Sequence, residues 1–93
     1  MPTTITQVED QTRGKTILHV SGSITLDDAL FLEKIALEMR AKLGKNLTID
    51  LADLHFLDSD GAPVIRRLED EHNFEIEGLM IFLQKIVEET EAT

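Results

Sequence analysis

The stretch that most restricts the fold runs from residue 46 to residue 71 and reads NLTIDLADLHFLDSDGAPVIRRLEDE. Leu47, Ile49 and Leu51 alternate with more polar residues, and this period of two predicts a strand with one buried face. The chain then enters an acidic turn, residues 58–61. Pro63 follows, and its fixed φ and missing N–H suit the first turn of a helix. The sequence therefore predicts a strand, a loop and a helix in direct succession.

The predicted helix has a buried face and an outward face. Val64, Ile65 and Leu68 recur at helical spacing and are expected to pack on the sheet. The charged residues between them are expected to point outward: Arg66, Arg67, Glu69 and Asp70. Just before the loop, the apolar pair Phe56 and Leu57 is expected to carry the chain under the core.

The hydroxyl of Ser59 is expected beside the N-terminus of this helix. Unpaired backbone N–H groups and the helix dipole favour an anion there, so a phosphate added to Ser59 would be partly accommodated. Alternatively, Ser59 or Asp58 is simply the N-cap, a role that Ser and Asp commonly take. The local sequence leaves both interpretations open.

The segments before residue 46 predict a hairpin and a long helix. Residues 3–9 and 16–21 are β-rich and flank a turn at residues 11–15, which favours an antiparallel pair. His19 lies in the second strand, where a lone His is usually a structural residue. Thr25 and Asp28 have the spacing of a capping box, and Gly44 ends the helix. The apolar stripe expected to face the sheet consists of Ala29, Leu32, Ile35, Ala36, Met39 and Leu43.

Two features of the helices have alternative interpretations. Leu30 and Leu37 lie off the stripe, and wider burial is favoured over an exposed contact line. Residues 74–78 predict a short strand, and residues 79–91 predict a final helix with a broad apolar side. That helix is expected to pack beside the preceding one; the alternative is an exposed strip for a homodimer or another partner.

Together these segments predict a single α/β domain over residues 1–93. The expected architecture is a four-stranded mixed β-sheet with about three α-helices packed mainly on one side.

Composition narrows the possible classes of function. The chain has no cysteine, which rules out disulfides, thiolate catalysis and Cys-ligated zinc. No apolar run approaches the roughly 20 residues of a membrane span, and the first residues lack the pattern of a secretory signal, so a cytoplasmic location is expected. A net charge of −9 argues against binding nucleic acid or an anionic membrane. Such a negative charge would favour binding to a basic patch on a protein partner, although an acidic domain needs no special explanation.

The densest set of potential catalytic groups consists of aspartates: Asp50, Asp53, Asp58 and Asp60. Their spacing fits neither a magnesium site nor a calcium loop. The sequence also lacks a P-loop, a dinucleotide fingerprint and a nucleophile elbow. We therefore expect no enzymatic activity, no cofactor and no metal.

The pattern LxIDLxxLxFLDSxG, from Leu47 to Gly61, resembles the signature of the STAS domain family. This family includes anti-sigma-factor antagonists and the C-terminal domains of sulfate transporters. The predicted order of elements along the chain is also similar. In the antagonist branch a partner kinase phosphorylates the Ser that follows the Asp of the motif, so the resemblance implies that Ser59 is the phosphorylated residue.

The resemblance also implies a partner-binding surface, with two departures. Antagonists usually carry G-[ED]-[LI]-D after the second strand, whereas this chain lacks both acids there, and Asp27 and Asp28 are the nearest substitutes. Asp60 replaces the usual Ser or Thr, and its fixed charge would either imitate a modified state or keep a kinase from docking. The expected surface comprises Gly22, Ser23, Ile24, Thr25, Asp27, Asp28, Asp58, Ser59, Asp60 and Gly61.

The resemblance therefore implies a protein-interaction module, similar to anti-sigma-factor antagonists, that binds an anti-sigma factor or related serine kinase under control of Ser59. One alternative is an unmodified STAS scaffold, such as a component of a lipid-transport ABC system. Another is a domain that senses nucleotides or anions through the loop at residues 58–61.

Overall fold

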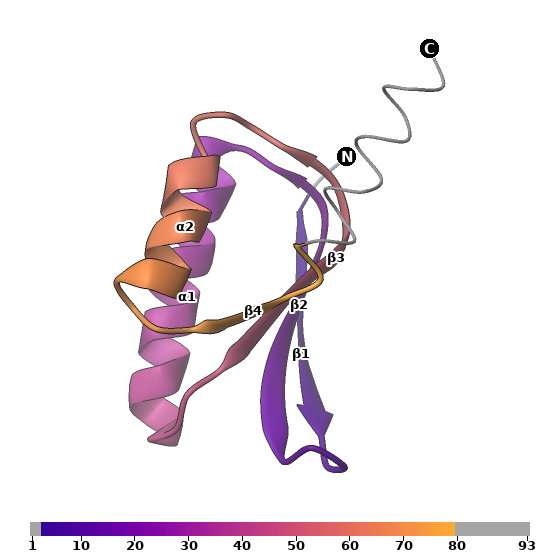
Figure 1. Cartoon of the computed structure of the whole chain (residues 1–93), viewed down its shortest axis with the longest axis vertical. Coiled ribbons are helices and arrows are strands. Elements are labelled where there is room, and N and C mark those ends of the chain that lie inside the picture. The colour runs from indigo at the N-terminus through magenta and orange to yellow at the C-terminus, as the bar shows by residue number, and fades with distance from the viewer. Residues whose placement is uncertain (1–2, 80–93) are drawn as a thin grey trace.

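The computed structural model describes residues 3–79 as an α/β unit with a four-stranded mixed sheet and two helices (Figure 1). The strands lie in the order β1-β2-β3-β4, with β1 and β2 antiparallel and the other two pairs parallel. Both helices lie on the same side of the sheet. The elements in chain order are β1 (Thr4–Asp10), β2 (Lys15–Ile24), α1 (Leu26–Leu43), β3 (Thr48–Leu57), α2 (Ala62–Asp70) and β4 (Glu75–Glu77).

The strand β2 is longer than the sequence pattern predicts. It continues through Gly22 and Ser23 to Ile24 because β3 also continues and pairs with it as far as Ile24 and Leu57. Two register shifts, one between His19 and Ser21 and one between Gly22 and Ser23, absorb extra residues of β3. This extension brings the end of β2 to the end of β3, where the acidic loop begins.

The prediction for Phe56 is wrong. Its side chain is 53% exposed, because β3 remains a regular strand up to Leu57 and alternates its faces. Ile24, the partner of Leu57 in the ladder, is fully buried, whereas Phe56 and its partner Ser23 take the opposite face. The chain therefore does not pass under the core before the loop.

Helix α1 begins and ends as the sequence predicts. Thr25 is the N-cap, Asp28 completes the capping box, and Gly44 closes the helix in the left-handed conformation with φ 67°. The predicted stripe is only partly right. Leu43 and Leu30 are each 43% exposed, whereas Leu37 is partly buried against the core. Of the other residues in the predicted stripe, Ala29, Leu32 and Ala36 are fully buried, and Ile35 and Met39 are partly buried.

Helix α2 lies beside α1 and has the predicted inner face. Val64, Ile65 and Leu68 are buried. On the flank towards α1, Arg67 donates two hydrogen bonds to Glu33, at 2.6 Å and 2.7 Å. The pairing lowers the pKa of Glu33 and raises that of Arg67, because each charge stabilises the other. This bidentate contact fixes the two helices against each other.

After α2 the chain returns to the sheet as β4. Phe74 is buried, and Glu75–Glu77 pairs in parallel with Thr48–Asp50 of β3. The final helix predicted for residues 79–91 lies outside the described residues, except for its first residue, Leu79. Within residues 3–79, neither helix is apolar and long enough to span a bilayer.

Candidate functional site

The structure brings the two segments predicted to form one surface into contact. The backbone N–H of Asp58 donates to the carbonyl oxygen of Ile24 over 2.8 Å, which ties the acidic loop to the last residue of β2. Gly61 lies against the start of α1: a Cβ at this glycine would be 3.2 Å from the carbonyl oxygen of Thr25 and 3.5 Å from the Cβ of Ala29. We call residues 58–61 the acidic loop and its surroundings the candidate site.

The start of α2 differs from the prediction. Its N-cap is Gly61, and no side chain within residues 3–79 caps the helix, so neither Ser59 nor Asp58 has that role. The Asp58 side chain instead accepts a hydrogen bond from the N–H of Asp60 at 3.2 Å, one residue before the cap. Asp58 therefore stabilises the turn that precedes the helix.

The unpaired N–H groups expected at this helix start are absent from the structure. The N–H groups of Gly61 and Ala62 both donate to the carbonyl oxygen of Asp58, and those of Val64 and Ile65 donate to that of Gly61. Pro63 lies at the start of the helix and has no N–H. The first turn therefore offers an incoming phosphate no backbone donor of its own.

Ser59 is exposed at the tip of the acidic loop. Its hydroxyl lies 3.5 Å from Oδ1 of Asp58, the outer limit of a hydrogen bond. Asp60 beside it is also exposed, whereas Asp58 is half-buried. The loop therefore holds its backbone through internal hydrogen bonds while it presents the Ser59 hydroxyl to solvent.

The two candidate substitutes for the missing acids have different surroundings. Asp28 accepts hydrogen bonds from the N–H and the hydroxyl of Thr25, both at 3.0 Å, and those bonds help to lower the pKa of its carboxyl group. Its charge is therefore already used at the helix cap. Asp27 is exposed, and its side chain has no hydrogen bond or ion pair within residues 3–79, so it is the acid that this turn presents.

The expected surface residues differ in accessibility. Ile24 is fully buried and Gly22 is also buried, so the Ile24 side chain cannot contact a partner and this part of the prediction is corrected. Both residues belong to β2, and their role here is to position the backbone. Gly61 is buried too, while Ser23 is half-buried and Thr25 is exposed.

Two apolar residues next to this surface were missed. Leu26 and Leu30 follow the cap residue Thr25, stand one turn apart and are 38% and 43% exposed. Helical spacing places them on the same flank of α1 as Glu33, which pairs with α2. The spacing of Leu30 was visible in the sequence, but the choice between burial and exposure depends on how closely α2 approaches.

A groove of about 520 Å³ opens beside Ser59 along α2. Its apolar lining comes from the end of β3, from α2, and from the segment around β4, and its polar rim includes Ser59, Arg66 and Glu69. The full lining is Leu57, Ser59, Ala62, Pro63, Ile65, Arg66, Glu69, Ile76 and Leu79.

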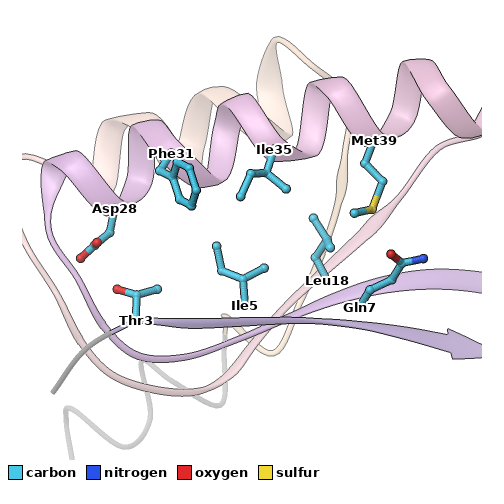
Figure 2. Close-up of a pocket in the computed structure, with 8 residues that line it drawn as sticks. All are labelled: Thr3, Ile5, Gln7, Leu18, Asp28, Phe31, Ile35 and Met39. Atoms are coloured by element: carbon cyan, nitrogen blue, oxygen red, sulfur yellow. The ribbon is translucent and has the colours of Figure 1, made fainter.

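A second hollow of about 430 Å³ lies between β1 and α1 (Figure 2). Side chains of both elements point into it and give it an apolar centre, as Figure 2 shows for Ile5, Phe31 and Ile35. Its polar lining residues are already paired, because Thr3 donates to the carbonyl oxygen of Ser23 and Gln7 donates to Glu9. Asp28, the third, is held by the capping box.

The aspartates considered for catalysis do not converge. Asp50 accepts a hydrogen bond from the N–H of Ala52, and Asp53 lies 2.6 Å from Nε2 of His19 on the strands, away from the acidic loop. This pairing accounts for His19 as a structural residue. Within residues 3–79, no group of three His, Asp or Glu side chains is arranged to hold a metal ion.

Comparison of the sequence with protein-family models and with curated proteins finds no match.

Proposed function

We propose that this chain is a STAS-like protein-interaction module whose docking is controlled by phosphorylation of Ser59. The observation that carries the proposal is the contrast within the acidic loop. The Ser59 hydroxyl is exposed, while the backbone beneath it is anchored to β2 through Asp58 and Ile24. A residue placed in this way is accessible to a kinase and lies beside a surface that a partner can contact.

The modification adds charge to a crowded acidic position. A kinase would transfer the γ-phosphoryl group of a nucleoside triphosphate to Oγ of Ser59, with loss of the Oγ proton to the kinase and release of the nucleoside diphosphate. The product carries nearly two further negative charges between Asp58 and Asp60. The Oγ of Ser59 makes only a 3.5 Å contact with Asp58, and the hydrogen bond from Asp60 to Asp58 does not use it. A phosphate on Oγ therefore changes the surface without requiring the domain to refold.

Phosphorylation is expected to weaken docking because the adjacent surface is partly apolar. Gly61 of the acidic loop lies against the start of α1, so a partner that covers Leu26 and Leu30 and extends onto the loop also removes water from Ser59. A neutral hydroxyl loses little on desolvation, whereas a phosphate dianion loses much more. The partner envisaged is an anti-sigma factor or a related serine kinase, and the location envisaged is the cytoplasm.

The occupied donors at the start of α2 count against the anion-sensing alternative. A free nucleotide phosphate would find the N–H groups of Gly61, Ala62, Val64 and Ile65 already bonded. The scaffold alternative differs from the proposal only in that Ser59 stays unmodified, and binding measurements with modified protein separate the two.

The proposal is tested with two forms of the full chain, one with Ser59 and one with phosphoserine incorporated at position 59. Both are immobilised and exposed to lysate of the cells that make the protein. Proteins retained by either form are then purified, and their Kd for both forms is measured. We expect a partner that binds the Ser59 form and the Ser59→Ala variant and is lost with phosphoserine or Ser59→Asp.

The matched control carries phosphoserine in place of Thr12, in the exposed turn between β1 and β2. It has the same added charge at the opposite end of β2 and should bind like the Ser59 form. Equal affinity of the Ser59 and phosphoserine-59 forms for every retained partner would contradict the proposal.

A further inference from the structure

The loop must accept a phosphate without help from the helix start. Between Asp58 and Ile65, only the N–H of Ser59 itself has no acceptor within the described part of the chain, and Pro63 has no N–H. Asp58 and Asp60 add negative charge on either side. A cationic side chain within reach would offset the repulsion that these carboxylates exert on a phosphate at Ser59.

Arg66 is the arginine that is available. The other three arginines of the chain are engaged: Arg13 with Asp10 and Glu77, Arg67 with Glu33, and Arg40 with the carbonyl oxygen of His72 and the ring of Phe74. Arg66 is exposed and has no ion pair or side-chain hydrogen bond within residues 3–79. Its side chain lines the same groove as Ser59.

The spacing of the two residues favours contact. The carbonyl oxygen of Asp58 accepts from the N–H of Ala62, which closes the turn that leads into α2. Within α2, Arg66 lies four residues after Ala62, so the two share one face of the helix, and both line the groove beside Ser59. Helical side chains lean towards the N-terminus, which directs Arg66 towards Ser59. The two groove residues between them, Ala62 and Pro63, are short.

We propose that a phosphate on Ser59 is bound within the same chain by the guanidinium group of Arg66. This inference rests on the proposed function, because it concerns the modified form. Arginine forms paired, charge-assisted hydrogen bonds to phosphate oxygens, which offset the repulsion from the flanking carboxylates. The contact places the phosphate and the guanidinium group over the groove along α2.

The test is a ³¹P NMR titration of the full chain with phosphoserine at position 59. The charged groups around the phosphate are Asp58 and Asp60 on the loop, Asp27 and Asp28 at the start of α1, Glu69 on α2, and Arg66 itself. The carboxylates raise the second pKa of the phosphate and Arg66 lowers it. We expect Arg66→Gln to raise that pKa by about 0.5 to 1 relative to the phosphorylated parent.

The matched control is Arg13→Gln, which makes the same change in net charge at the far end of β2 and should leave the phosphate pKa unchanged. Arg66 is exposed, so its replacement does not disturb the core. Equal phosphate pKa values in the Arg66→Gln and Arg13→Gln proteins would overturn the inference. The proposed function is tested independently, because partner binding can depend on phosphoserine whether or not Arg66 contacts it.

Discussion

The N–H of Asp58 and the carbonyl oxygen of Ile24 are joined by a 2.8 Å hydrogen bond between residues 34 positions apart. Through this bond the acidic loop and the last residue of β2 occupy fixed relative positions. Ile24 is fully buried, so the anchor belongs to the core, whereas Ser59, one residue beyond Asp58, is exposed. The exposed Ser59 hydroxyl is thus presented next to a backbone that is hydrogen-bonded to the core.

The close contact of Gly61 with α1 predicts a specific sensitivity to side-chain volume. Gly61→Val places methyl groups against the backbone of Thr25 and the side chain of Ala29, where a single Cβ already lies at 3.2 Å. We expect the free energy of unfolding to fall by about 1–3 kcal/mol in urea denaturation. Ala62→Val, at the adjacent exposed residue, should cost less than about 1 kcal/mol. Equal stability of the two variants would show that the loop does not pack on α1.

The exposed leucines on α1 offer a matched test of the docking surface. Leu30 and Leu43 are both 43% exposed, but Leu30 lies near the acidic loop and Leu43 at the other end of the helix. We expect Leu30→Ala to weaken binding of the partner identified through Ser59 about tenfold, as expected for an apolar anchor. Leu43→Ala should leave the Kd unchanged, and both variants should keep nearly the parent stability. Equal effects of the two substitutions on the Kd would remove Leu30 from the surface.

The contact between Glu33 and Arg67 predicts a dependence of stability on pH. Arg67 lowers the pKa of Glu33 below its ordinary value of 4.5 in the folded state. The resulting stabilisation is complete above the unfolded pKa and is lost as the pH falls through the folded pKa. Glu33→Gln should therefore reduce the free energy of unfolding by about 0.5–1 kcal/mol at pH 7, a small value because Arg67 is 40% exposed.

This difference between the parent and Glu33→Gln should shrink as the pH falls below about 4.5. The control is Glu38→Gln on the exposed side of α1, where Glu38 has no ion pair within the described residues. Its stability should run parallel to that of the parent across the titration. A difference for Glu33→Gln that stays constant down to pH 3 would contradict the assignment.

Gly78 tests how β4 joins the sheet. Its φ is +78°, and a Cβ there would lie 2.4 Å from the backbone nitrogen of Ala52, so the clash involves backbone that cannot rotate away. Gly78→Ala should lower the free energy of unfolding by more than about 2 kcal/mol. Gly14→Ala has a similar φ of +66° but open space around it, so only the backbone strain of about 1 kcal/mol should remain. Similar losses for both variants in urea would argue against this close approach.

Local signals predicted much of the fold. Thr25 with Asp28, Gly44 and Pro63 mark their helix ends through chemistry confined to a few residues, and the structure places all of them as predicted. The exposure of Phe56 and Leu30 was not predictable in this way. The exposure of Phe56 follows from the continued pairing of β3 with β2, and the exposure of Leu30 follows from how closely α2 approaches α1. Both are tertiary effects.

The sequence predicted where the candidate site lies but not the hydrogen bonds within it. Asp58, Ser59 and Gly61 lie where the strand, loop and helix pattern puts them. The hydrogen bonds that occupy the first turn of α2 were not foreseen, because the sequence does not show that the helical turn already begins at the carbonyl oxygen of Asp58. The sequence also did not single out Arg66, because which side chains line the groove beside Ser59 depends on how α2 and β3 pack.

The most direct measurement is mass spectrometry of the protein isolated from its own cells in different growth states. Intact mass followed by fragmentation across residues 57–66 should locate a phosphate on Ser59 in at least one state. Protein that carries an unmodified Ser59 in every state, or a phosphate on a different residue only, would contradict the switch at this loop.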